Sequence, residues 1–470
     1  MQQYFTKNMN TLANNIKQVY LIGIGGIGMS GLARYFANQN IAVAGYDLTP
    51  SNLTNKLVSE GIAVQFTDSI DSIPTTIKND SQQTLIIYTP AIPQSSKQLQ
   101  FFKNNNFRVL KRAETLGLIS ENYQTAAVAG THGKTSTSTL LAYILSHTSE
   151  GCNAFVGGIS KNFASNVVLN SKSNRLVVEA DEYDRSFLSL KPDLAIITSV
   201  DADHLDIYNT HNEVKQAFNS FISKIEKGGT LIIKHNIKNI VEGKTNIKTY
   251  TYSIDEKADF YPSNLTNQNG IYTFSLNTPF GKIKNLTLGT PGKFNVENSV
   301  AASAAAILWG TGEENLRQSL KSFKGISRRF DIQYQGKATY IDDYAHHPAE
   351  INAAITSLKE MFPNRRITGI FQPHLYSRTR DFADDFARSL SLLNELILLD
   401  IYPARELPIP GVTSSIIFDK VQCQHKTLCT TSELMDILNN SEIDVLITMG
   451  AGNIDRQVPK IVELLKQKEK

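Results

Sequence analysis

The chain has 470 residues, and at roughly 150 residues per domain this length predicts about three domains. Hydrophobic residues make up 41% and charged residues 19% of it, as is typical of globular proteins with buried cores. The net charge of +3 gives no reason to expect nucleic acid or an anionic membrane as a partner. Three scattered cysteines, a polar N-terminus and no apolar run near 18 residues predict a soluble, cytoplasmic protein that is not inserted in a membrane.

Strand-like and helix-like segments alternate along most of the chain, which predicts α/β architecture with parallel sheets. A first block, residues 1–122, contains predicted strands over Val19–Gly23, Ile41–Tyr46, Leu85–Tyr88 and Arg108–Leu110. A second block, residues 123–329, contains strands at 126–129, 175–180 and 194–200, a turn-rich stretch at 259–290 and a helix over 296–308. A third block, residues 330–470, contains strands at 338–341, 367–371, 396–399 and 445–449, with helices over 348–362 and 381–393. The turn-rich stretch predicts antiparallel β structure inserted in the second block.

The first block carries a glycine-rich loop, Gly23 to Gly31 (GIGGIGMSG), directly after its first predicted strand and before a helix. Asp47 ends the next strand, as in a dinucleotide-binding fingerprint. Such a loop lets the backbone approach a pyrophosphate at a helix N-terminus. The diphosphate of a UDP-sugar would bind there in the same way as that of NAD. A diphosphate site is the prediction, and a purely structural glycine turn is the alternative.

The second block opens with Gly130-Thr131-His132-Gly133-Lys134-Thr135-Ser136, between an apolar strand and a helix-like stretch. In a phosphate loop, backbone N–H groups converge on the anion and the helix N-terminus adds positive potential. Lys134 is predicted to reach the β- and γ-phosphates and the Thr135 hydroxyl to hold Mg²⁺. The first glycine is followed by two residues before Gly-Lys, where the usual P-loop has four. This loop predicts an ATP-using enzyme, the alternative being an ordinary turn with a solvated lysine.

Two strands of the second block end in acidic clusters. Glu179 to Asp184 (EADEYD) follows one strand, and Asp201 to Asp206 (DADHLD), with His204 inside it, follows the next. A divalent cation would relieve the repulsion among these carboxylates, whereas a solvated acidic loop is the alternative. Two such clusters in the block with the phosphate loop favour a metal–ATP site.

The third block carries a polar cluster at a strand exit, Asp342 to Pro348 (DDYAHHP), and a second at Gln372 to Arg380 (QPHLYSRTR). Polar groups gathered at strand ends are where α/β proteins form their sites. Arg378 and Arg380 are able to clamp a carboxylate or a phosphate. Arg328-Arg329, at the boundary of the second block, are able to reach the nucleotide predicted at the phosphate loop.

Together these segments resemble the Mur ligases, the ATP-dependent amide-forming enzymes of bacterial cell-wall synthesis. The resemblance covers nearly the whole chain and extends to Ile401–Glu406 and Gly450–Asp455. The phosphate loop is shared by the family, whereas GIGGIGMSG and DDYAHHP are similar to its alanine-adding branch. The resemblance implies a Rossmann-like N-terminal domain (1–122) for a UDP-sugar, a P-loop central ATPase domain (123–329) and a Rossmann-like C-terminal domain (330–470) for an amino acid.

The implied reaction joins L-alanine to the carboxylate of UDP-N-acetylmuramate through an acyl phosphate, with ADP and phosphate as co-products, in peptidoglycan precursor synthesis. The implied partners are these small molecules with ATP and Mg²⁺, and the implied assembly is a monomer or homodimer. The implied catalytic residues are Lys134, His204, His346, His347 and Arg378, and the metal ligands are Thr135, Glu179 and His204. The implied ATP contacts are Gly130 to Ser136 together with Asn295, Asn298, Arg329 and Asp343. The implied UDP-sugar contacts are Gly25, Gly26, Ile27, Gly28, Met29, Ser30 and Asp47. The implied amino-acid contacts are Tyr344, His346, His347, Arg378 and Arg380.

Three positions depart from the family pattern. Phe294 stands where the family often has histidine, and Leu375 where the alanine-adding enzymes usually have arginine. Other branches carry a carbamylated lysine where this chain has Phe218-Asn219-Ser220, so no carbamate is predicted. Three alternative functions remain. One is the recycling ligase of the same family, which adds a whole tripeptide. The others are a nicotinamide-dependent dehydrogenase and a non-catalytic P-loop switch protein.

Overall fold

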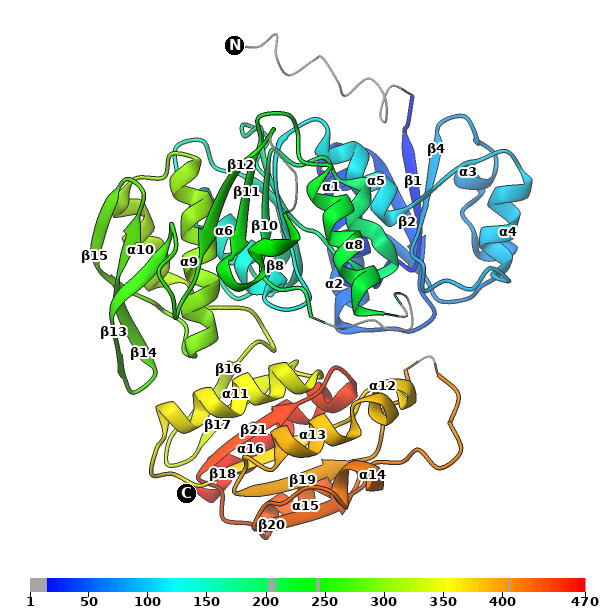
Figure 1. The fold of residues 1–470 in the computed structure, drawn as a ribbon. Coiled ribbons are helices and arrows are strands. Elements are labelled where there is room, and N and C mark those ends of the chain that lie inside the picture. Colours follow the sequence, from blue (N-terminus) through cyan, green and yellow to red (C-terminus); the bar gives the residue numbers. More distant parts are fainter. Residues whose placement is uncertain (1–14, 202–207, 209, 242–245, 405, 470) are drawn as a thin grey trace. The chain divides into compact units, whose positions relative to one another are not determined.

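The computed structural model describes residues 15–201, 208, 210–241, 246–404 and 406–469 (Figure 1). These residues form two compact units. The first takes in the chain as far as Ser263 with Ser275–Leu286 and Asn298–Phe323, and the second takes in Asn264–Phe274, Thr287–Glu297 and the chain from Lys324 onward. Among the described residues, no helix has both the length and the apolar content that crossing a bilayer requires.

The N-terminal part of the first unit is a parallel sheet with strand order β3-β2-β1-β4-β5. Its strands are β1 (Gln18–Ile22), β2 (Ala42–Tyr46), β3 (Ala63–Gln65), β4 (Thr84–Tyr88) and β5 (Arg108–Lys111). Its helices are α1 (Ile27–Asn38), α2 (Asn52–Ser59), η1 (Ile70–Ser72), α3 (Thr75–Lys78), α4 (Lys97–Asn104) and α5 (Arg112–Ser120). Because β1 and β2 pair in parallel, the glycine loop after β1 and Asp47 after β2 meet at one edge of the sheet.

A second sheet, in the order β12-β11-β10-β6-β9-β7-β8, is parallel except that β8 runs antiparallel to β7. Its strands are β6 (Gln124–Ala129), β7 (Asn153–Ser160), β8 (Ser165–Val168), β9 (Arg175–Glu179), β10 (Leu194–Ile197), β11 (Thr230–Lys234) and β12 (Lys248–Tyr252). Its helical segments are α6 (Lys134–Ser146), η2 (Tyr183–Ser189), α8 (His211–Ile222) and η3 (His235–Ile240). Strand β6 lies between β9 and β10, so the phosphate loop has an acidic strand end on each side.

The first two sheets share one hydrophobic core. Helix α1 lies between them, in contact with β2 on one side and with β7 and β8 on the other (Figure 1). Leu21 and Leu32 of the first sheet region belong to the same apolar cluster as Phe155 and Val178 of the second. The glycine loop and the phosphate loop are therefore held in one packed body.

Three consecutive strands, β13 (Tyr261–Gln268), β14 (Ile271–Thr278) and β15 (Gly281–Thr287), form a separate small sheet. Two-residue turns join them, so neighbouring strands run in opposite directions, as the turn-rich pattern predicted. Helices α9 (Lys293–Leu308) and α10 (Glu313–Ser322) follow.

The second unit is built on a sheet with order β16-β17-β21-β18-β19-β20, in which β16 is antiparallel to β17 and the other pairs are parallel. Its strands are β16 (Asp331–Gln335), β17 (Thr339–Asp343), β18 (Ile367–Phe371), β19 (Glu395–Leu399), β20 (His425–Cys429) and β21 (Val445–Met449). Its helical segments are α11 (Pro348–Met361), α12 (Tyr376–Asp381), α13 (Ala383–Leu390), α14 (Ser415–Phe418), α15 (Leu434–Asn439), η4 (Asn453–Gln457) and α16 (Val458–Lys468).

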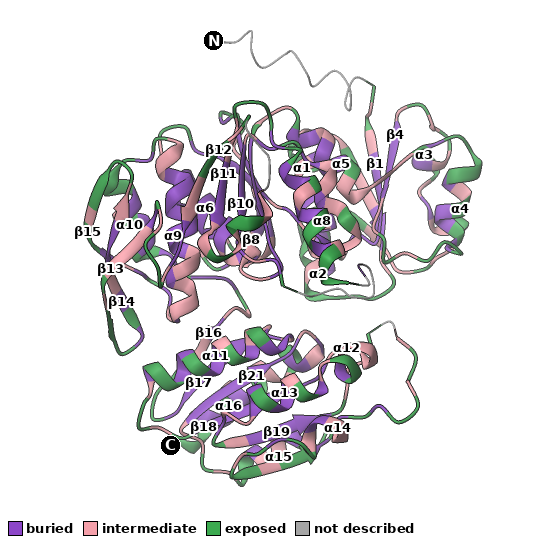
Figure 2. Cartoon of the chain, viewed as in Figure 1, coloured by how far each residue is buried: buried purple, intermediate pink, exposed green. Residues whose placement is uncertain are grey.

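Alternate side chains of this sheet enter two different cores. Ile341 and Phe371 pack with α11 and α13, whereas Tyr340 and Ile370 pack with α15 and α16. The inner strands β17, β18, β19 and β21 are accordingly buried along almost their whole length, while the covering helices are buried on one side only (Figure 2). The α/β class and the inserted antiparallel sheet predicted from the sequence are confirmed.

Five of the strands that the sequence did not predict, β3, β8, β12, β16 and β20, lie at the outside of a sheet and carry few consecutive apolar residues. The interior strands β7 and β11 and several helices were also not predicted. The helix predicted over 381–393 is shorter in the structure, where α12 ends at Asp381, Phe382 separates the two helices, and α13 spans Ala383–Leu390.

Candidate active site

The phosphate loop has the backbone that its glycines predict. Gly130 and Gly133 have φ angles of 141° and 81°, and Gly133 is the N-terminal cap of α6. A Cβ atom on Gly130 would stand 2.0 Å from the Thr198 hydroxyl oxygen, which donates a hydrogen bond to the His132 carbonyl. Only glycine fits at this position, because a side chain would collide with β10 as well as strain the backbone.

Lys134 lies inside the loop and is paired with a buried carboxylate. Its ammonium donates to the Gly130 carbonyl at 2.6 Å and lies 2.8 Å from a carboxylate oxygen of Glu182, whose side chain is 1% exposed. Burial lowers the pKa of Lys134, but the charges of Glu182, Asp181 and Glu179 outweigh it and raise the pKa overall. Lys134 is therefore a cation at neutral pH, held by the Gly130 and Thr131 carbonyls of the loop and by Glu182. The sequence placed Glu182 in an acidic cluster but did not single it out.

The predicted metal ligands are partly described. Thr135 is buried in the first turn of α6, and Glu179 ends β9, the strand beside β6. One Glu179 oxygen accepts the Gly157 N–H at 2.9 Å. His204 lies outside the described residues, and no group of three or more His, Cys, Asp or Glu side chains suited to a metal occurs in the part of the chain that is described. A threonine hydroxyl and one carboxylate suit Mg²⁺, which keeps waters and phosphate oxygens as its other ligands.

The remaining loop residues are held by the end of β10. The Thr131 hydroxyl is 2.8 Å from that of Ser199 and accepts the Asp201 N–H, and His132 Nε2 lies 3.7 Å from an Asp201 oxygen. Ser136 lies half-buried in the first turn of α6. With Glu182 after β9, these contacts place two strand ends around the loop, as the sheet order requires.

Of the two predicted asparagines on α9, the structure places Asn298 at the loop. Its side-chain oxygen accepts the Thr137 hydroxyl at 3.3 Å and would lie 2.7 Å from a Cβ on Gly133. Asn295 donates to the Pro291 carbonyl at 2.6 Å, within its own turn. Phe294 packs edge-on against Phe330, with ring centroids 5.5 Å apart, so this departure from the family pattern fills a hydrophobic core.

The first glycine loop is organised by Asp47. Its carboxylate accepts the Gly25 N–H at 2.8 Å, and a Cβ on Gly25 would stand 2.8 Å from the same oxygen. Gly26 caps α1 without a side-chain partner, so its first turn presents backbone N–H groups. Met29 and Ser30 are buried, and the Ser30 hydroxyl donates to the Ile27 carbonyl. Their side chains therefore face the interior.

Two residues near this loop were not predicted from the sequence. Arg112, the first residue of α5, lies with its guanidinium over Gly28, 2.9 Å from where a Cβ would be. Asn166 of β8 contacts α1 from the other sheet, its amide 3.2 Å from the Ser30 hydroxyl. The only sequence signal for Arg112 was the basic pair Lys111-Arg112 at the end of a predicted strand. No sequence signal pointed to Asn166.

In the second unit, two arginines pack on one tyrosine at the end of β17. The guanidinium carbons of Arg328 and Arg329 lie 5.1 and 5.0 Å from the centre of the Tyr344 ring. Arg328 also donates to the Gly450 carbonyl at 2.7 Å and pairs with Asp342 at 3.4 Å. Tyr344 is thus fixed by cation–π contacts on the exit of the strand.

Asp343, predicted near the ATP ribose, is buried and accepts two backbone N–H groups, from Phe330 at 2.9 Å and Ala345 at 2.7 Å. Burial raises the pKa of its carboxyl to about 7, against the opposing influence of the Arg329 charge. Both of its oxygens therefore hold the strand exit in shape.

The two histidines have different surroundings. His346 Nδ1 lies 2.9 Å from the Tyr344 carbonyl and 3.3 Å from a Glu350 oxygen. His347 is the N-terminal cap of α11, where its Nδ1 accepts the Ala349 N–H. The sequence placed both histidines in one cluster but did not assign the cap.

The predicted arginines lie on the short helix α12. Arg380 is exposed and pairs with the adjacent Asp381 at 2.7 Å, whereas Arg378 is half-buried. Leu375, at φ 72°, is the N-terminal cap of this helix. Glu406 holds the first turn of the helix by accepting hydrogen bonds from both the N–H and the hydroxyl of Ser377. The two predicted arginines therefore lie on one short helix but differ in exposure.

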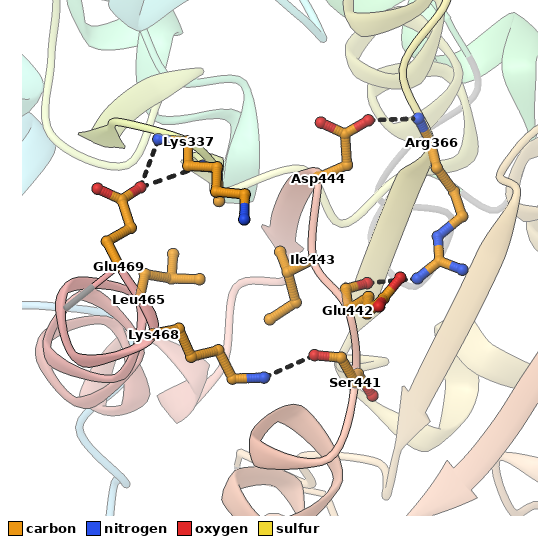
Figure 3. Close-up of a pocket in the computed structure, with 10 residues that line it drawn as sticks. Lys337, Arg366, Ser441, Glu442, Ile443, Asp444, Leu465, Lys468 and Glu469 are labelled. Atoms are coloured by element: carbon orange, nitrogen blue, oxygen red, sulfur yellow. Dashed lines mark hydrogen bonds between the residues drawn. The ribbon is translucent and has the colours of Figure 1, made fainter.

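A pocket of about 650 Å³ lies at the opposite edge of the same sheet, before the starts of β17, β18 and β21 (Figure 3). Its charged groups are largely satisfied within the protein: Lys468 donates to the Ser441 carbonyl, and Glu469 accepts backbone N–H groups of Lys337 and Ala338. None of the residues predicted to act on a substrate lines it.

Taken together, a phosphate loop with a buried lysine, flanked by acidic strand ends in an α/β sheet, defines the class of ATP-using enzymes. The chain matches the profiles described as "Mur ligase family, catalytic domain" over residues 18–124, "Mur ligase middle domain" over 128–306 and "Mur ligase, glutamate ligase domain" over 328–452. The chain belongs to the Mur ligase family, whose members use ATP.

Similar proteins include the UDP-N-acetylmuramate–L-alanine ligase of Porphyromonas gingivalis, 49% identical over 453 residues that cover 96% of this chain and 99% of the relative. The crystal structure of UDP-N-acetylmuramate–alanine ligase MurC from Thermotoga maritima matches with a TM-score of 0.81 and 25% identity, covering 96% of this chain and all of that one. A murein peptide ligase from Psychrobacter arcticus matches with a TM-score of 0.69 and 20% identity over 96% of this chain and 98% of its own, which shows a shared fold.

Proposed function

We propose that this enzyme joins L-alanine to the lactyl carboxylate of UDP-N-acetylmuramate, using ATP and forming an acyl phosphate on the way to the amide. The observation that carries the proposal is the built phosphate loop around Lys134, in a chain 49% identical over its length to a curated alanine ligase. ADP and phosphate are the co-products. The reaction belongs to peptidoglycan precursor synthesis, and we place it in the cytoplasm, where ATP and sugar nucleotides are available.

In the first half-reaction, the carboxylate of the sugar nucleotide attacks the γ-phosphorus of ATP. Two anions must approach each other, and Lys134 offsets part of their repulsion because its raised pKa keeps it charged. The loop N–H groups and the N-terminus of α6 add to this positive potential. Thr135 and Glu179 are the described residues that would hold Mg²⁺, which would supply positive charge against the phosphoryl group in transfer. We extend the metal assignment to His204 on the family resemblance alone.

In the second half-reaction, the amine of L-alanine attacks the acyl carbon and phosphate leaves. We assign the alanine carboxylate to Arg378, since Arg380 is exposed and paired with Asp381. We assign proton acceptance from the amine to His346, because the His347 ring caps α11 through the Ala349 N–H. Tyr344 lines the same strand exit beside Arg329.

The recycling ligase, which adds a tripeptide to the same sugar nucleotide, is the competing function. The full-length identity with alanine ligases favours the single amino acid, whereas the murein peptide ligase is 20% identical. The three domain ranges 1–122, 123–329 and 330–470 remain part of the proposal, as does a monomeric or homodimeric assembly.

The test is phosphate release from ATP and Mg²⁺ with UDP-N-acetylmuramate, in the presence of L-alanine, of the stem tripeptide, or of neither. Release that requires L-alanine, with a product heavier by one alanyl residue, supports the proposal. Release only with tripeptide would reassign the enzyme, and no release from folded, ATP-binding protein would refute a ligase.

A further inference from the structure

The side chain of Arg112 lies beside the first glycine loop and, among the described residues, makes one ion pair but no hydrogen bond. The side chain is 19% exposed, and within the described ranges its guanidinium donates no hydrogen bond. Its nearest charged partner is an Asp181 oxygen at 3.7 Å, beyond hydrogen-bonding distance. None of its nitrogen atoms is among the buried side-chain atoms that lack a partner, so the five N–H donors of this guanidinium remain open to solvent or to a ligand.

The position of this guanidinium points to its ligand. It lies over Gly28, with Nη1 2.9 Å and Cδ 3.1 Å from the place where a Cβ would be. Gly28 belongs to the first turn of α1, whose cap, Gly26, supplies no side-chain acceptor. An anion on the N–H groups of this turn would therefore lie beside the fork of Arg112, which suits the paired oxygens of a phosphate.

The topology explains how Arg112 reaches this place. It begins α5, directly after β5 ends at Lys111, and β5 lies two strands away from β1 in the parallel sheet. The carboxyl ends of these strands share one edge, so a side chain from β5 can close the loop that follows β1. Asp181, in the loop after β9, has a carboxylate oxygen 3.7 Å from Nη2 of the same guanidinium.

We propose that Arg112 is a substrate-binding residue that holds the diphosphate of the sugar nucleotide against the Gly25–Gly28 loop. The proposal rests on the proposed function, because it takes the ligand of the first sheet to be a UDP-sugar. The diphosphate takes no part in bond formation, so its contacts contribute equally to substrate and transition state. Loss of Arg112 should weaken binding of the sugar nucleotide and leave the turnover number nearly unchanged.

The first experiment measures binding by calorimetry for the wild-type enzyme and Arg112→Met. The probes are UDP-N-acetylmuramate and UDP-N-acetylglucosamine, which has the same diphosphate but no lactyl carboxylate. Methionine keeps an apolar stem against Gly28 and removes the fork. We expect Kd to rise roughly 10- to 100-fold for both probes, since hydrogen bonds to a charged partner contribute that much.

Steady-state kinetics give a second readout. For Arg112→Met we expect KM for UDP-N-acetylmuramate to rise by a similar factor, with kcat and the KM for ATP within about twofold of wild type. Arg112→Lys keeps the charge without the fork and should fall between the two. It also carries the test if the methionine variant does not fold.

Lys111→Met is the matched control. It removes a neighbouring positive charge whose ammonium lies 3.5 Å from Asp184 and whose side chain is 44% exposed. We expect both probes to bind it as they bind wild type. Equal weakening in this variant would show a general charge effect and overturn the assignment.

Two other results would overturn the proposal. Weaker binding of UDP-N-acetylmuramate with unchanged binding of UDP-N-acetylglucosamine would assign Arg112 to the carboxylate, and unchanged binding of both would make it structural. Failure of the wild-type enzyme to bind either sugar nucleotide would instead contradict the proposed function, so the two failures are distinguishable.

Discussion

Removal of Lys134 should cost stability as well as activity, because it leaves Glu182 charged and buried. The ammonium and a carboxylate oxygen are 2.8 Å apart, with side chains 13% and 1% exposed. At an effective dielectric constant of about 20 their attraction is about 6 kcal/mol, most of which offsets the cost of taking both charges out of water. Breaking such a pair from one side destabilises by about 3–5 kcal/mol.

The assay is a thermal melt of Lys134→Met, Glu182→Gln and the double variant, together with phosphate release. We expect the single variant Lys134→Met to melt on the order of 5–15 °C below wild type, and the double variant to recover most of that loss. Ligase activity should be absent from both, since neither has the lysine. Stability and activity are thereby separated.

A matched control is the exposed pair Lys191–Glu121, which has the same 2.8 Å separation with side chains 53% and 42% exposed. Lys191→Met should leave the melting temperature unchanged, because solvent screens this pair. The reasoning is refuted if Lys134→Met melts with wild type, or if the double variant is no more stable than the single one.

Three further predictions concern the phosphate loop, the end of β9 and the end of β17. Gly130→Ala would place a Cβ 2.0 Å from the Thr198 hydroxyl at φ 141°, and we expect it to raise the Kd of a fluorescent ATP analogue at least about tenfold, whereas Gly312→Ala, with open space around it, should not. Glu179→Gln keeps an acceptor for its backbone partner but removes a charge, so phosphate release should need roughly tenfold more Mg²⁺ or more; an unchanged Mg²⁺ titration would exclude it as a ligand. The carboxyl of Asp343 has its pKa raised by burial from an ordinary value of 3.8 to about 7, so the folded protein binds the extra proton between these values. Its contribution to stability therefore falls by roughly 4 kcal/mol as pH rises from 4 to 7, and urea unfolding should show the free energy of unfolding of wild type falling relative to that of Asp343→Asn over this range; a rise relative to that variant would contradict this sign.

Local sequence was sufficient for the elements that carry the two loops. Strand β6, the glycine turn and α6 are contiguous, and their apolar run, glycines and Lys-Thr pair are decided within about 20 residues of chain. The same holds for β1, the first glycine loop and α1. Edge strands such as β16 and β20 were missed because their pairing, rather than their composition, makes them strands.

The direction of a side chain within those elements depended on what packs against them. Met29 and Ser30 stand in the glycine motif, yet α1 lies against a second sheet and both side chains turn inward. Phe294 breaks the family pattern on α9, and its contact with Phe330 shows that the position belongs to a core. Neither result follows from helical periodicity alone.

The sequence by itself therefore determined the fold class, the family and the identity of the residues at each strand end. Only the tertiary structure decided which of them are neighbours, because strand order in a parallel sheet is set by crossover connections and not by position in the chain. Glu182 becomes the partner of Lys134 since β9 pairs with β6, and Arg112 reaches Gly28 since β5 and β1 end at one edge of their sheet.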